Sequence, residues 1–165
     1  MSNLKFLLPV RIEPQAPYHA DGLYAALQDR RIYSFLDQEP PTAVKVLRER
    51  IERLSMGAPA DTGQTWLHWT VFEADVVVGY TQATIDSGGI ASLAYVLTPR
   101  VWGRSVAHVA CALTIAELEA LPGVVDIVAD TEEGNVRSQA LLRRLGFQRS
   151  HQAGSDIFYK LRIVP

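Results

Sequence analysis

The sequence contains one cysteine, Cys111, among 165 residues. A disulfide framework and a zinc site built from cysteine pairs are therefore excluded. Cys111 lies in an apolar helical pattern and has no cationic neighbour in sequence that would lower the pKa of its thiol. It is predicted to be a small buried hydrophobic residue rather than a nucleophile.

The sequence also lacks an excess of basic residues and any long apolar run. With 16 Lys and Arg against 18 Asp and Glu, the formal net charge is −2, which offers no general field for nucleic acid or an anionic membrane. No run approaches the ~20 apolar residues of a membrane span, and residues 1–9 lack the long apolar region and cleavage site of a signal peptide. We therefore expect a cytoplasmic protein without a nucleic-acid or membrane partner.

Length and composition favour one globular domain over residues 1–165. The apolar share is 48% and the charged share is 21%, and a chain of this size buries roughly 70% of its unfolded surface. We detect no internal repeat, low-complexity tract or interdomain linker.

Residue periodicity predicts the order of helices and strands. Alternating or continuous apolar residues predict strands at residues 4–12, 65–73, 76–85, 91–97, 124–129 and 156–164. Spacings of three and four predict helices at 19–28, from Thr42 onward, at 105–121 and at 135–145. The order strand, helix, strand over 91–129 predicts a βαβ unit with two parallel strands. The expected fold is mixed α/β, with a twisted sheet of about six to seven strands flanked by helices.

The helix at 105–121 is expected to be largely buried. Its main apolar stripe is predicted to consist of Val106, Val109, Leu113, Ala116 and Ala120.

Residues 100–107 lie where the strand at 91–97 leads into this buried helix. A helix N-terminus offers free amides and a partial positive charge, which suits a diphosphate. Gly103 would let such a ligand approach the backbone, and Arg100 and Arg104 could add charge-assisted contacts. In the alternative interpretation, Gly103 only makes a tight turn and Ser105 only caps the helix.

A second motif lies at residues 135–147. Asn135 is a good N-cap, since its side-chain oxygen can accept the amide proton of Ser138. Ser138 leads an inward stripe that continues through the leucines at 141, 142 and 145, and Gly146 supplies the left-handed residue that ends a helix. Capping alone would account for Asn135, and a functional role is the other interpretation.

Together, the two motifs resemble those of a known family. The pattern Asn-x-x-Ser-x-x-Leu-x-x-x-Leu-Gly-Phe at 135–147 resembles the last helix of the GNAT superfamily of acyl-coenzyme A dependent N-acyltransferases. Residues 95–107 resemble the acyl-coenzyme A segment of that superfamily, and the variant Trp-Gly-Arg, with residues 29–36, resembles the branch of ribosomal-protein alanine N-acetyltransferases. The similarity spans residues 4–161.

This sequence departs from the family pattern at three positions. Ser105 stands at the second glycine of the phosphate loop, and His108-Val109 stands where many members of the branch have Thr-Glu. We interpret His108 as a packed histidine with its hydrogen bonds satisfied rather than as a catalytic residue.

The resemblance implies a site and a reaction. Tyr95, Val96 and Leu97 would lie beside the pantetheine arm, and Asn135 would contact the cofactor from the other side. The pyrophosphate would be cradled by Trp102, Gly103, Arg104, Ser105, Val106 and Ala107. Ser138 would face the thioester sulfur as a non-obligatory acid. The implied enzyme is an acetyltransferase that uses acetyl-coenzyme A, needs no metal and acts on a primary amine of a small molecule or a protein N-terminus.

The sequence leaves the base, the acceptor pocket and the assembly open. Candidate bases near predicted strand ends are Glu73, Asp86, Asp130, Glu132, Asp156, His68 and His151, and the alternative for each is a surface or turn residue. Candidates for an acceptor pocket are Trp66, Trp69 and Tyr80, for which the alternative is a place in the core. A homodimer is compatible with the sequence. The competing function is a non-catalytic acyl-coenzyme A binding or sensing module. A nucleotide oxidoreductase is disfavoured because the Gly-x-Gly-x-x-Gly pattern does not occur after a strand.

Overall fold

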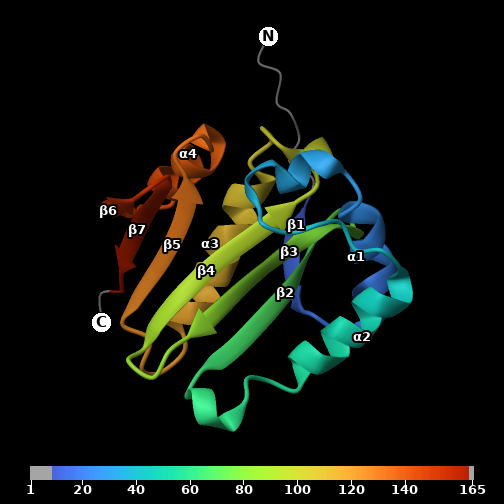
Figure 1. The fold of residues 1–165 in the computed structure, drawn as a ribbon, viewed down its shortest axis with the longest axis horizontal. Coiled ribbons are helices and arrows are strands. Elements are labelled where there is room, and N and C mark those ends of the chain that lie inside the picture. The colour runs from blue at the N-terminus through green and yellow to red at the C-terminus, as the bar shows by residue number, and fades with distance from the viewer. Residues whose placement is uncertain (1–8, 164–165) are drawn as a thin grey trace.

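The computed structural model describes residues 9–163. Within them, seven strands form one sheet in the order β1-β2-β3-β4-β5-β7-β6 (Figure 1). The strands are β1 (Val10–Pro14), β2 (Thr65–Glu73), β3 (Val76–Ile85), β4 (Ile90–Leu97), β5 (Asp126–Glu132), β6 (Gln148–Ala153) and β7 (Asp156–Arg162). Neighbouring strands are antiparallel except β4 and β5, which are parallel. The predicted mixed α/β fold and its βαβ unit are confirmed.

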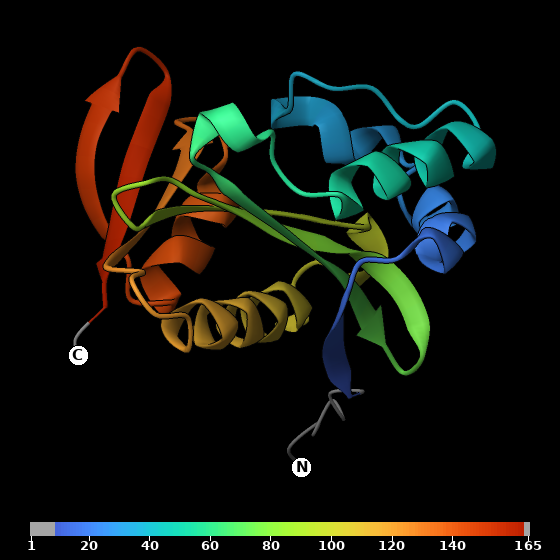
Figure 2. The ribbon, with the colours of Figure 1, turned by 90° about the horizontal axis from the view of Figure 1, so that it is seen from below.

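Helices cover both faces of the sheet (Figure 2). One face is covered by α1 (Ala20–Ala26), α2 (Val44–Ser55) and the short 3₁₀ segments η1 (Pro17–His19) and η2 (Arg30–Phe35). The other face is covered by α3 (Val106–Glu119), and α4 (Val136–Arg144) lies beside α3. Two further 3₁₀ turns, η3 (Ala60–Thr62) and η4 (Pro99–Val101), precede β2 and α3. Each face of the sheet therefore has its own apolar core.

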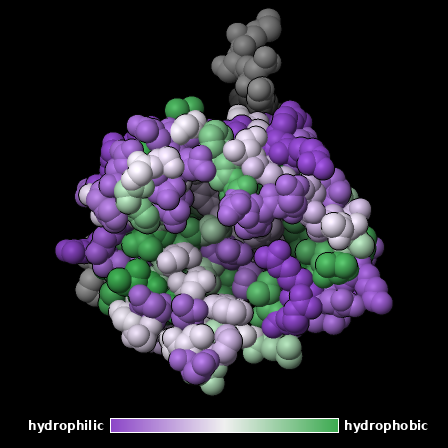
Figure 3. Space-filling view, viewed as in Figure 1, coloured by the Kyte–Doolittle hydropathy of each residue, from purple (hydrophilic) through white to green (hydrophobic). Residues whose placement is uncertain are grey.

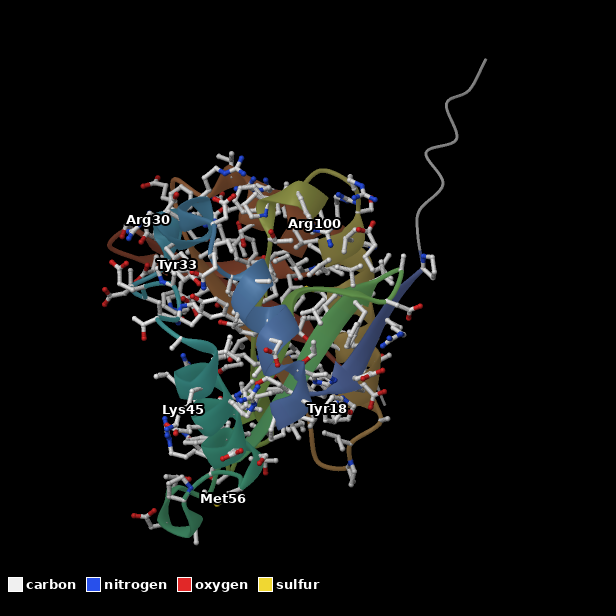
Figure 4. All side chains as sticks on the ribbon, turned by 90° about the vertical axis from the view of Figure 1, so that its right-hand side faces the viewer. Tyr18, Arg30, Tyr33, Lys45, Met56 and Arg100 are labelled. Atoms are coloured by element: carbon white, nitrogen blue, oxygen red, sulfur yellow. The ribbon has the colours of Figure 1, made fainter. Side chains whose placement is uncertain are left out.

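Helix α2 shows how sequence periodicity sets one of these cores. Leu47 and Ile51 are buried against α1 and the sheet. On its polar side Arg48 forms an ion pair with Asp21 at 3.1 Å. Lys45 and the exposed Met56 project from the outer side of the helix (Figure 4). Most charged residues of this helix are exposed to solvent.

The apolar stripe predicted for α3 is wrong. The buried residues of this helix are Val106, Ala110, Cys111, Thr114, Ile115 and Leu118. Leu113 is 37% exposed, and Ala116 and Ala120 face solvent. Small apolar residues occur on every side of α3, so their spacing along the sequence does not identify which side is buried. Part of that face is polar, because Thr114 Oγ1 hydrogen-bonds to Thr81 Oγ1 at 2.7 Å.

Cys111 is fully buried, and burial raises the pKa of its thiol to about 12. The interpretation of this residue as a small hydrophobe is confirmed. Separately, no helix between residues 9 and 163 is long and apolar enough to cross a membrane.

Several boundaries differ from the prediction. Strand β6, which pairs with β7, was not predicted, because all of its residues are exposed and show no apolar pattern. Strand β5 extends to Glu132 instead of ending at 129, and α2 begins at Val44 with Ala43 as its N-cap instead of at Thr42. Strand β1 runs to Pro14, and the predicted strand residues 4–8 lie outside the described part.

Candidate active site

The main cleft forms where β4 and β5 separate. Their parallel ladder pairs Ile90, Ala91 and Ser92 with residues 126–128 and then stops. Beyond that point both strands continue, to Leu97 and Glu132, without pairing to each other. The gap leaves a cavity of ≈ 780 Å³, which is within the range of small-molecule and cofactor sites.

Three other segments line this cleft together with β4 and β5. Its walls come from β4 (93–97), β5 (130–132), the first turns of α4, most of residues 31–37, and the turn between β6 and β7. Figure 3 shows the face on which η2 and α2 lie, a surface of mixed hydropathy with a hollow near its centre. The contribution of residues 31–37 was not predicted, because nothing in their spacing shows that they fold over the end of β4.

Two hydroxyl groups meet across the cleft. Tyr95, on β4, and Ser138, on α4, form a hydrogen bond through their side-chain oxygens. Burial raises the pKa of the Tyr95 phenol well above its usual range, although its bond to Ser138 acts in the opposite direction. Tyr95 therefore keeps its hydroxyl proton throughout the ordinary pH range.

Asn135 caps its helix, as its sequence context predicted. Its Oδ1 accepts the backbone N–H of Ser138 at 3.1 Å, so it caps α4. It also lines the cleft. At the other end of α4, Gly146 adopts a φ of 93° and the N–H of Phe147 donates to the carbonyl of Leu142 at 3.0 Å, as a left-handed cap requires.

The cleft extends to the N-terminal end of α3. Of the predicted pyrophosphate cradle, Trp102 and Ala107 line the cavity, whereas Gly103, Arg104, Ser105 and Val106 do not. The interpretation of Ser105 as a side-chain cap is wrong, because its side chain makes no capping hydrogen bond and its φ is +65°. Ser105 therefore keeps the left-handed backbone that a glycine at this position would adopt.

The two arginines of the loop do not point into the cleft. Arg104 forms an ion pair with Glu73, a carboxylate whose side chain is only 2% exposed. Arg100, the middle residue of η4, is exposed (Figure 4). Glu73 is therefore committed to this ion pair and does not line the cavity as a base.

Arginines from α4 lie closer to the α3 end of the cleft. The guanidinium of Arg137 stacks on the Trp102 ring at 3.5 Å from its centroid, and Trp102 Nε1 donates to the carbonyl of Leu97 at 2.9 Å. Arg144 Nη2 lies 3.5 Å from Ser105 Oγ. No sequence pattern predicts these contacts, because they join α4 to a loop more than 30 residues away.

The structure separates the candidate bases. Asp130, Glu132 and Asp156 line the cleft, and Glu132 stands directly opposite Asp156 on neighbouring strands. His68 lines a small cavity between α1, α2 and the sheet. Burial is the main cause that lowers the pKa of its imidazole, and the positive charge of Arg50 lowers it further.

Two other candidates have structural roles. Asp86 accepts the backbone N–H groups of Gly88 and Ile90 in a turn, at 2.8 and 2.9 Å. His151 stacks on Phe158 with a ring-centroid distance of 4.4 Å.

The aromatic residues proposed for an acceptor pocket lie away from the cleft. Trp69 is buried in the core, Trp66 donates through Nε1 to Gln64 at 3.0 Å, and Tyr80 lines the small cavity beside His68. His108 differs from the prediction, because its Nδ1 is buried without a hydrogen-bond partner among residues 9–163.

Comparisons with known proteins agree with this architecture. Residues 10–148 match the family described as acetyltransferase (GNAT) domain. The chain is similar in fold to the ribosomal L7/L12 α-N-protein acetyltransferase RimL in complex with coenzyme A (TM-score 0.81, 16% identity, 93% of this chain and 94% of that chain covered). It is also similar to the ribosomal-protein-S5-alanine acetyltransferase from Vibrio fischeri (TM-score 0.80, 13% identity, 93% of each chain covered). No curated protein matches the sequence.

A third structure with this fold is the spermidine N-acetyltransferase from Vibrio cholerae in complex with coenzyme A and spermine (TM-score 0.74, 12% identity, 93% of this chain and 95% of that chain covered). At these identities the likenesses concern the fold, whereas the family match covers most of the chain. With its parted β4–β5 pair beside the N-terminal end of α3, the chain is an acetyltransferase by its family match. The chain belongs to the GNAT acetyltransferase family.

Proposed function

We propose that this protein transfers the acetyl group of acetyl-coenzyme A to a primary amine of a protein N-terminus or a small molecule. The observation that carries the proposal is the Tyr95–Ser138 hydroxyl pair inside a cleft that opens between β4 and β5. We place the protein in the cytoplasm, and its buried, protonated Cys111 is compatible with that.

The cleft fits a coenzyme A thioester. Beyond Ser92, the edge of β4 that faces the cleft pairs with no other strand of residues 9–163, so its backbone groups are available to a pantetheine arm. At the α3 end, the first amides of the helix have no side-chain cap, and such amides favour phosphate. Arg137, held on Trp102, brings a positive charge to the same end.

The acceptor amine reaches the thioester from the acidic end of the cleft. Asp130, Glu132 and Asp156 line that end, and carboxylates attract an ammonium group and can take a proton from it through water. An α-amino group, with a pKa near ~8, reaches the neutral nucleophilic form more readily than a lysine near ~10.4. A weak or water-mediated base is therefore sufficient for a protein N-terminus.

The reaction breaks one bond and forms another. The neutral nitrogen attacks the thioester carbonyl carbon, the C–S bond breaks, and the nitrogen releases a proton toward the carboxylate end. The departing sulfur takes a proton from Ser138 or from water. Because a free thiol has a pKa of ~8.5, protonation of the thiolate assists the reaction only moderately, and positioning supplies much of the rate.

A calorimetric titration with acetyl-coenzyme A tests the cofactor site. Gly103→Val is expected to weaken binding at least ~10-fold, because a branched side chain would occupy open space beside the backbone, where a Cβ added at Gly103 would have no atom within 4 Å. Gly57→Val is the matched control, since Gly57 also has a positive φ and open surroundings but lies just after α2. Equal affinity of both folded variants would remove Gly103 from the site.

Turnover separates an enzyme from a binding module. Thiol release from acetyl-coenzyme A is measured with peptides that have a free α-amino group, with the same peptides already acetylated, and with alkyl polyamines. Release that requires the free amine supports the proposal. Binding of acetyl-coenzyme A without release for any amine would favour the non-catalytic module.

A further inference from the structure

We propose that the side chain of Tyr95 is a positioning residue, which holds the Ser138 hydroxyl in the orientation that donates its proton to the departing thiolate sulfur. The inference rests on the proposed function and assigns the Tyr95 side chain a role separate from backbone contacts of β4 with the cofactor.

The backbone of Ser138 is held in place by its own helix cap. Its N–H donates to Asn135 Oδ1 at 3.1 Å, which holds the first turn of α4 at the cleft. This bond leaves rotation about χ1 free, and a serine has three staggered positions for its hydroxyl. A second contact is needed to select one of them.

Tyr95 supplies that contact from a separate element. Its ring is partly buried against the core that contains Leu93, Ile127 and Leu142, so the ring is held by packing. Its hydroxyl reaches the Ser138 hydroxyl, and the residues come from β4 and α4, 43 positions apart. The bond therefore links the serine to the rigid sheet instead of to its own helix.

The direction of the hydrogen bond follows from the two chemistries. A phenol, with an ordinary pKa of ~10, is more acidic than an aliphatic alcohol and is the stronger donor. Tyr95 is therefore the donor of this hydrogen bond, and Ser138 Oγ is the acceptor. The proton of Ser138 is then free to point along the cleft, where the sulfur would lie. When the C–S bond breaks, this proton passes to sulfur, and Ser138 recovers a proton from water while Tyr95 stays protonated.

A double-mutant cycle tests the inference. Wild type, Tyr95→Phe, Ser138→Ala and the double variant are compared for kcat and for KM of acetyl-coenzyme A. Tyr95→Phe is expected to lower kcat ~10-fold at constant KM, less than Ser138→Ala, which should cost at most ~10²- to 10⁴-fold. In the Ser138→Ala background, Tyr95→Phe should change kcat less than ~2-fold, since Tyr95 acts only through Ser138. Equal losses in both backgrounds, or a change confined to KM, would overturn the inference.

Thr114→Val is the matched control for loss of core stability. It removes a buried hydroxyl–hydroxyl bond between Thr114 and Thr81, and Thr81 pairs with Tyr95 across β3 and β4. The control should lower the melting temperature without the fall in kcat. If Thr114→Val lowers kcat as much as Tyr95→Phe does, the effect of Tyr95 is structural and the inference is wrong.

Crystal structures with bound coenzyme A give a readout that does not depend on turnover. In the wild type, Ser138 Oγ should face the sulfur while it accepts from Tyr95. In Tyr95→Phe the serine should occupy another rotamer or more than one. An unchanged serine rotamer overturns the inference. Failure of the proposed function would look different, as absence of thiol release with every amine in all variants.

Discussion

Strand β4 is paired with β3 from Ala91 to Leu97, but with β5 only from Ile90 to Ser92. On the β3 side, the ladder continues to the end of the strand and the two backbones come into close contact. On the β5 side, the same strand leaves an open edge that forms the wall of the cleft. One strand is therefore fully paired along one edge and open to the cleft along the other. Substitutions on the closed side should affect folding, and those on the open side should affect binding and turnover.

The largest effect is expected on the closed side, for Gly79→Ala. A Cβ at Gly79 would overlap the carbonyl oxygen of Val96, and the φ of Gly79 is +151°. Neither backbone can move without opening the ladder, so the substitution should lower the free energy of unfolding by ~3 kcal/mol or more. Urea unfolding measures it. Gly57→Ala, in open surroundings, should cost no more than ~1 kcal/mol, and equal losses would contradict the close packing of β3 on β4.

The second-largest effect concerns the ion pair between Glu73, at the end of β2, and Arg104, in the loop before α3. Arg104→Ala leaves the buried Glu73 carboxylate unpaired and should lower the free energy of unfolding by ~2–3 kcal/mol. The loss of unfolding free energy would be larger if both side chains of the pair were fully buried, but Arg104 is one-third exposed. Glu73→Gln should cost less, because the arginine can turn toward water. Urea unfolding measures both losses. If Glu73→Gln costs as much as Arg104→Ala or more, the unpaired buried carboxylate is not the cause of the destabilisation.

On the open side, Asn135→Asp should separate capping from binding. Aspartate caps as well as asparagine, so the melting temperature should hold. The added carboxylate would lie in the cleft near the anionic cofactor, and the affinity for acetyl-coenzyme A should fall ~10-fold, as measured by calorimetry. An unchanged affinity would leave capping of α4 as the only role of Asn135.

The smallest effect is expected for Ser105→Gly. A serine at a φ of +65° is held in a conformation that favours glycine. Because its side chain caps nothing, glycine should raise the free energy of unfolding by up to ~1 kcal/mol while cofactor affinity is retained. Thermal unfolding with and without acetyl-coenzyme A is the measurement. A lower stability would mean that the contact of Ser105 with Arg144 outweighs the strain.

The sequence by itself determined the elements whose signals are local. Strands β2 and β3 were predicted to the residue, since each is a segment rich in β-branched and aromatic residues. In the structure, Ala74 and Asp75 between them adopt positive φ. The cap at Asn135 and the left-handed Gly146 were predicted because each depends on a few neighbouring residues. The family was recognised from two short motifs in the right order, and residues 10–148 match that family.

Only the tertiary structure decided which residues meet. The inner face of α3 could not be read from a helix that is apolar all round, and β6 has no apolar face to read. The Tyr95–Ser138, Arg137–Trp102 and Arg104–Glu73 contacts join residues at least 31 positions apart. Such contacts depend on where β4 leaves β5 and on how α4 then packs, and no local pattern encodes that point of separation. Periodicity reports the environment of a single element, whereas an active site is assembled from several.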